Sequence, residues 1–268
     1  MNRLIILILI FFSQISIAQS DKQFISDFLL EDELKSGNQL KEYEKYDFAN
    51  VWNTTPNEVI FGIIGEDHQR IRIKLISINK NHQKPNEYYV FGKSMVKENV
   101  CDFFGTIKIK KIREVKEFHY GVDEKYKNKD IKQQGLLIAE YVFDEDAQQK
   151  HSGLFKGKLY SKWYLNKNDK IVYDDIQIIS DGYTNNAFIG TWKSYSTGNE
   201  KECRWADWRV PNANSDFDIG AGEFSVSEKY WNKGWMGYAL KNQHRKEQMS
   251  REKSNKKPKG WGEIKPGA

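Results

Sequence analysis

The stretch Arg70-Ile71-Arg72-Ile73-Lys74-Leu75 decides the fold class. Its apolar side chains alternate with cations, and this period of two is typical of a strand with one buried and one solvated face. The same alternation recurs in residues 103–110 and 155–163. Turn-forming residues separate these runs, for example at 166–169. Together these patterns predict an all-β fold built as an antiparallel meander.

A glycine stands in the middle of three of the expected strands. The three patterns are Phe103-x-Gly105-x-Ile107, Phe155-x-Gly157-x-Leu159 and Phe188-x-Gly190-x-Trp192. Glycine weakens a flat strand, and it is used where a strand bends sharply or another backbone approaches closely, as at the corner of a small closed barrel. We therefore expect the meander to close into a β-barrel rather than to form a sandwich.

The third pattern extends to Phe188-Ile189-Gly190-Thr191-Trp192-Lys193-Ser194-Tyr195, which resembles the Gly-x-Trp signature of the calycins, the superfamily of lipocalins and avidins. This resemblance implies a lipocalin-like β-barrel that holds a small ligand. The region Ser16-Ile17-Ala18-Gln19 resembles the cleavage region of uncharacterised exported proteins of Bacteroidetes-type bacteria. That second resemblance implies export and no particular activity.

The chain divides into four parts. Residues 1–18 have a basic start, a short apolar run and a small-residue exit, which is typical of a secretory signal peptide. Residues 19–50 form an N-terminal helical and extended segment, with a short amphipathic helix expected at 21–36. Residues 51–240 form the β-barrel domain, and residues 241–268 form a disordered basic tail. We expect a secreted or periplasmic protein without a transmembrane segment, because no apolar run reaches membrane-spanning length.

The positive charge is concentrated in the tail. The whole chain carries a formal net charge of +5, and residues 241–268 contribute nine Lys and Arg against three acidic residues. Without this tail and Arg3, residues 19–240 keep a net charge of −2. A near-neutral body lacks the basic signature of nucleic-acid binding, so we expect no nucleic-acid partner. The sequence leaves the oligomeric state open.

No strong catalytic motif occurs, and the five histidines are scattered. The sequence thus favours a non-enzymatic protein that needs no cofactor. Enzymes that use only carboxylates are compatible with it, and strand parity turns Asp174 and Asp207 toward apolar faces. These two residues are the candidate general acid and base of an alternative function, glycan hydrolysis. A structural ion pair between Asp207 and Arg209 is the competing interpretation.

Groups suited to ligand recognition gather between residues 192 and 209. They are Trp192, Tyr195 and Trp205 for stacking, with Asp207 and Arg209 for oriented hydrogen bonds. They favour a small apolar or glycan-like ligand in the mouth of the barrel. The competing interpretation is that Trp192 and Trp205 fill the core, and a filled interior would argue against ligand binding. A protein–protein interaction module of the envelope is a further alternative, which a large exposed apolar patch would favour.

Two smaller features complete the sequence predictions. Oxygen-bearing side chains recur at Asn212, Asn214, Asp216, Asp218 and Glu223. Their spacing is similar to a calcium loop, although Phe217 occupies the position that an EF-hand reserves for glycine, so the alternatives are an irregular calcium site and a polar turn. Export would permit a disulfide between Cys101 and Cys203, and the competing interpretation is two buried thiols.

Overall fold

The computed structural model describes residues 31–255. The predicted signal peptide at residues 1–18, most of the helix expected at 21–36 and the last part of the basic tail lie outside the described residues.

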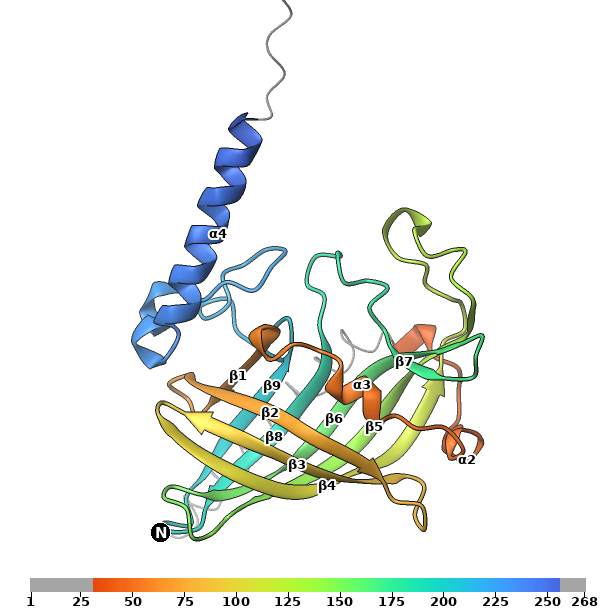
Figure 1. Ribbon diagram of the computed structural model, residues 1–268, viewed down its shortest axis with the longest axis horizontal. Helices are drawn as coiled ribbons and strands as arrows, with labels where there is room; N and C mark the ends of the chain where they lie inside the picture. Colours follow the sequence, from red (N-terminus) through yellow and green to blue (C-terminus); the bar gives the residue numbers. More distant parts are fainter. Residues whose placement is uncertain (1–30, 256–268) are drawn as a thin grey trace, which may run out of the picture.

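Nine antiparallel strands form one sheet, in the order β5-β4-β3-β2-β1-β9-β8-β6-β7. A further pairing between β5 and β6 joins eight of these strands, all except β7, into a closed ring (Figure 1). The predicted antiparallel, β-rich meander is therefore confirmed. The strands are β1 (Ile60–Ile64), β2 (Gln69–Lys80), β3 (Glu87–Val96), β4 (Asn99–Glu114), β5 (Ile131–Glu145), β6 (Gly153–Asn166), β7 (Ile171–Tyr173), β8 (Asn185–Ser194) and β9 (Glu200–Asp207).

Short helices close one end of the ring. Two of them, α2 (Leu40–Tyr43) and α3 (Ala49–Asn53), lie beside the strand ends on the right of Figure 1. Phe48 and Trp52 from this segment are 1% and 4% exposed and join the core inside the ring. The remaining short helices are η1 (Glu31–Glu33), η2 (Asn57–Val59), η3 (Val122–Glu124) and η4 (Glu228–Lys233).

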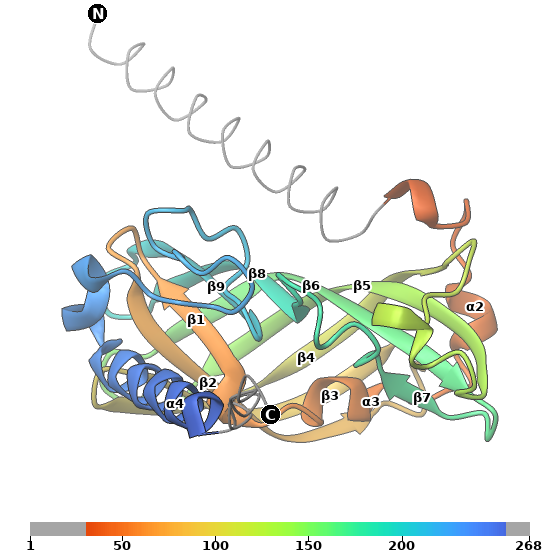
Figure 2. The ribbon, with the colours of Figure 1, turned by 90° about the horizontal axis from the view of Figure 1, so that it is seen from above.

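The predicted disordered tail is wrong for the part that the structure describes, because α4 (Met236–Asn255) is a continuous helix. Its start is fixed by aromatic contacts that the sequence pattern does not reveal. Tyr238 packs against Phe61 of β1 and Phe224, with ring centroids 4.9 and 5.4 Å apart. Beyond these contacts the helix extends away from the ring (Figures 1 and 2). No helix within residues 31–255 is both long and apolar enough to cross a membrane.

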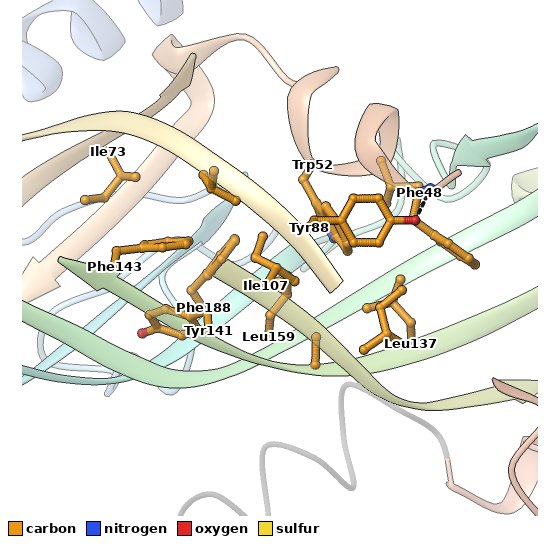
Figure 3. Packing of buried hydrophobic residues seen from close by; sticks show 14 of the residues in the cluster. Phe48, Trp52, Ile73, Tyr88, Ile107, Leu137, Tyr141, Phe143, Leu159 and Phe188 are labelled. Atoms are coloured by element: carbon orange, nitrogen blue, oxygen red, sulfur yellow. Dashed lines mark hydrogen bonds between the residues drawn. The ribbon is translucent and has the colours of Figure 1, made fainter. Parts of the chain in front are cut away.

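Aromatic side chains fill the middle of the ring. Tyr141 and Phe143 of β5 meet Phe188 of β8 there (Figure 3). Phe188 stacks on Trp205 of β9, with ring centroids 4.7 Å apart and planes 13° from parallel. Burial of such large rings is the main source of stability that this arrangement offers. The interior between the helices and the opposite strand ends is therefore a packed core.

The strand glycines occupy points where two backbones nearly touch. Gly157 pairs directly with Gly190, and an ideal Cβ on either residue would lie 2.7 Å from the Cα of the other. A Cβ on Gly105 would overlap the carbonyl oxygen of Val142. The explanation from close backbone approach is confirmed at these positions.

Candidate functional site

The end of the ring opposite α2 and α3 is not filled. The hairpins β1–β2, β3–β4, β5–β6 and β8–β9 all turn at this end, which we call the mouth. A pocket of about 510 Å³ lies there between the strand ends. This mouth pocket is lined by Ser94, Asn99, Glu145, Phe155, Trp192 and Lys201, among others.

A buried carboxylate organises the mouth pocket. Glu145, the last residue of β5, is 3% exposed and accepts hydrogen bonds from the Ser94 hydroxyl, from the Gly153 N–H at 2.7 Å and from the Trp192 Nε1–H at 2.9 Å. Burial raises the pKa of Glu145, and these donors partly offset that effect. The bond to the indole nitrogen fixes the orientation of the Trp192 ring in the pocket wall.

Glu145 was not among the residues predicted from the sequence, although the strand pattern carries a signal for it. The inward-facing positions of β5 are Leu137, Ala139, Tyr141 and Phe143, and Glu145 continues this alternation by one further step. A carboxylate on the buried face of a strand is expensive unless it is hydrogen-bonded. Strand parity alone was therefore sufficient to mark Glu145 as a residue with buried partners.

The five predicted ligand-binding residues do not meet in one pocket. Trp192 lines the mouth pocket, whereas Trp205 is 2% exposed inside the packed core. Tyr195 is 42% exposed and donates its hydroxyl to Asp144. Arg209 lies outside the ring, because the chain turns at Trp208 with a φ of 71° directly after β9. The set is dispersed, and of its five members only Trp192 lines the mouth pocket.

The two candidate catalytic carboxylates also have different surroundings. Asp207 is 3% exposed and accepts hydrogen bonds from Thr55 Oγ1 at 2.8 Å and Asn186 Nδ2 at 2.9 Å. Burial raises its pKa to about 7. Asp174 lines a separate pocket of about 840 Å³ that Asp207 does not reach. Arg209 pairs with Asp218 rather than with Asp207. Asp207 therefore has neither Asp174 as a catalytic partner in one pocket nor Arg209 as the partner of a structural ion pair.

The carboxylates of the expected calcium loop face different cations. Asp218 pairs with Arg209, Asp216 with Lys229 and Glu223 with Arg245, at 2.7, 2.6 and 2.5 Å. Asn214 accepts the N–H of Phe217 at 2.9 Å, and Asn212 lines the pocket of about 840 Å³. Within residues 31–255 no group of three or more His, Cys, Asp and Glu side chains could hold a metal ion. These contacts give the calcium interpretation no support.

Both cysteines are buried free thiols. Cys101 on β4 is 1% exposed, and Cys203 on β9 is fully buried. Burial raises the pKa of each thiol, which disfavours the reactive thiolate. The structure thus agrees with the interpretation as two buried thiols and contains no disulfide between Cys101 and Cys203.

Comparisons with protein-family models, with curated proteins and with solved structures gave no match for this chain. The likenesses to calycins and to Bacteroidetes exported proteins accordingly stay predictions from short motifs.

Proposed function

We propose that the ring is a lipocalin-like β-barrel of an exported protein, which binds a small apolar or glycan-like ligand in its mouth and catalyses no reaction. The observation that carries this proposal is the pocket of about 510 Å³ left at one end of an otherwise filled ring. Ligand sites in proteins typically measure roughly 300–1,000 Å³ and combine an apolar lining with a few placed polar groups.

The chemistry of the mouth pocket suits a compact ligand with one apolar face. Trp192 and Phe155 supply aromatic surface, which can take the C–H face of a sugar ring or a hydrocarbon group. Glu145 already accepts the indole N–H of Trp192, so the orientation of this side chain is fixed before a ligand binds. Asp67 and Lys97 at the rim offer an acceptor and a donor to ligand hydroxyls. The packed core restricts a ligand inside the ring to this end.

Titration of the chain from Gln19 tests the proposal. The probes are a panel of mono- and oligosaccharides and a series of straight-chain alcohols, followed by tryptophan fluorescence and calorimetry. We expect saturable binding of at least one probe, loss of binding in Trp192→Ala, and unchanged binding in the control Trp208→Ala, since Trp208 lies outside the mouth pocket. Binding that survives Trp192→Ala, or no binding across both classes, would overturn the proposal.

A second candidate function has an observation of its own. Phe104 and Tyr89, on the outer face of β4 and β3, are 65% and 53% exposed, and the rings of Phe91 and Phe104 lie 4.8 Å apart. Exposed aromatic clusters favour protein–protein contact, so an envelope interaction module is the alternative. Cross-linking in the producing cells tests it. Cross-linked adducts that form with the wild type and disappear in Phe104→Ser would support this role. Identical adducts in the wild type and the variant would contradict it.

A further inference from the structure

A second pocket lies on the outside of the ring and is larger than the mouth pocket. Its volume is about 840 Å³, and it is enclosed by β5, β6 and the loop segments 174–184 and 209–218. No residue lines both this outer pocket and the mouth pocket. Whatever binds in one site therefore makes its contacts independently of the other.

One wall of the outer pocket is apolar. Leu34, Val115 and Leu136 are 4%, 9% and 2% exposed and form part of a small hydrophobic cluster on the outer face of the strands. Val210, which is also buried, contributes to the lining from the loop 209–218. This wall offers a surface for carbon-bound hydrogens of a ligand and excludes water behind it.

Two oppositely charged side chains line the same pocket on adjacent segments. The N–H of Asp174 donates to the carbonyl oxygen of Lys162 at 3.3 Å, and the Asn185 amide donates to the same carbonyl at 3.0 Å. Burial lowers the pKa of Lys162 and raises that of Asp174. Asp174 Oδ1 accepts the N–H of Ile176 at 3.1 Å. The two oxygens of a carboxylate can accept several hydrogen bonds, so Asp174 can also accept one from a ligand.

A hydrogen-bond donor without a partner completes the polar groups. The Nδ2 atom of Asn212 is buried and has no acceptor within residues 31–255, and Asn212 lines the outer pocket with its backbone in the left-handed region at a φ of 51°. Buried amide donors in native proteins are almost always paired. A ligand oxygen in the outer pocket would supply the missing acceptor.

We propose that the outer pocket is a second binding site, for a small hydroxyl-rich ligand of the monosaccharide class. A hydroxyl both donates and accepts, so the hydroxyls of one ligand can match the acceptor of Asp174 and the donor of Asn212, which line the same pocket. Among the other charges in the lining, Glu33 lies 2.9 Å from His119 and Asp218 lies 2.7 Å from Arg209, and Asp181 adds a further carboxylate. The pocket consequently has no excess positive charge that would select an anion, and its apolar wall fits the C–H face of a sugar.

The side-chain amide of Asn212 provides a direct readout. The isotope-labelled chain from Gln19 is titrated with D-glucose, D-galactose and N-acetyl-D-glucosamine, and with octanoate as a probe of the rival class of apolar acids. We expect at least one sugar to shift the Asn212 amide resonances in nuclear magnetic resonance spectra in a saturable way. Octanoate should leave them unchanged.

Variants locate the site. Asp174→Asn keeps the size of the side chain, and Asn212→Gly suits the left-handed backbone, so each should fold. Each should weaken sugar binding about tenfold or more, the usual effect of losing a well-placed hydrogen bond to a charged or buried group. Trp192→Ala at the mouth should leave this binding intact, which separates the outer pocket from the proposed function of the mouth.

The proposal is overturned if no sugar shifts the Asn212 amide, if octanoate shifts it in their place, or if both outer-pocket variants bind the sugar as well as the wild type. Sugar binding that is lost in Trp192→Ala and retained in Asp174→Asn would assign the sugar to the mouth and also refute a second site.

Discussion

Replacing Asp207 with asparagine should stabilise the protein at neutral and alkaline pH. Asp207 lies on the buried face of β9 without a cation beside it, and burial raises its pKa from 3.8 to about 7. Asparagine is nearly isosteric, and its oxygen can accept the bonds that Thr55 and Asn186 now donate to Asp207. Its amide can also donate to Asn186 Oδ1, a buried oxygen that has no donor in the part of the chain that the structure describes.

The magnitude follows from the two pKa values. A carboxyl whose pKa is higher in the folded state favours folding below its unfolded pKa, and this advantage is lost as the pH rises through its folded pKa. The pKa interval from 3.8 to about 7, at about 1.4 kcal/mol for each pH unit, means that above pH 7 the ionised Asp207 lowers the free energy of unfolding by about 4 kcal/mol. Between about pH 5.5 and pH 8 the wild type should therefore lose about 2 kcal/mol through Asp207. Asp207→Asn should not show this loss.

Urea unfolding at about pH 5.5 and pH 8 measures the effect through the free energy of unfolding. The control is Asp216→Asn, because Asp216 is exposed, pairs with Lys229 and has a lowered pKa. That variant loses only a solvent-exposed ion pair, so its free energy of unfolding should change little and by the same amount at both pH values. The reasoning fails if Asp207→Asn destabilises the fold equally at both pH values, since Asp207 would then act as a favourably placed anion.

Three further predictions concern the core. Gly190→Ala should destabilise the fold by about 3 kcal/mol, because the new methyl group would lie 2.7 Å from Gly157 Cα. The control Gly237→Ala lies in open space on α4 and should stabilise the fold by up to about 1 kcal/mol. Equal effects of the two variants in thermal unfolding would contradict this prediction. Tyr141→Phe removes a buried hydroxyl without a partner and should not destabilise, whereas Tyr88→Phe leaves the N–H of Phe48 unpaired and should cost about 1–3 kcal/mol in urea unfolding. Both cysteines should react with a thiol reagent in denaturant without prior reduction, and a non-reactive pair would indicate a disulfide.

Strand parity made most of the ring predictable from the sequence. Ile71 and Ile73 face the core and Arg72 and Lys74 face solvent, because a half-buried strand imposes that alternation. The glycine patterns gave a physical reason to expect close backbone approach, and Gly157 and Gly190 meet as that reason requires. These features depend on neighbouring residues and on the geometry of a single strand, which a sequence carries directly.

Features that depend on distant contacts were not predictable in the same way. The helix α4 is held by Trp235, which packs against Phe224 with ring centroids 5.5 Å apart and donates its indole N–H to the carbonyl of His68 at 3.0 Å. The polar composition of the tail gives no sign of this anchor. Parity correctly placed Asp207 on the buried face, but its partner Thr55 precedes β1 and is separated from it by more than a hundred residues.

The most direct test of the central claim is a crystal structure of the chain from Gln19 grown with the tightest-binding probe of the titration panel. The account predicts electron density for the probe inside the mouth pocket, against the ring of Trp192, with Glu145 still accepting the indole N–H. A mouth filled by the protein's own side chains, with the probe bound elsewhere or absent, would contradict it.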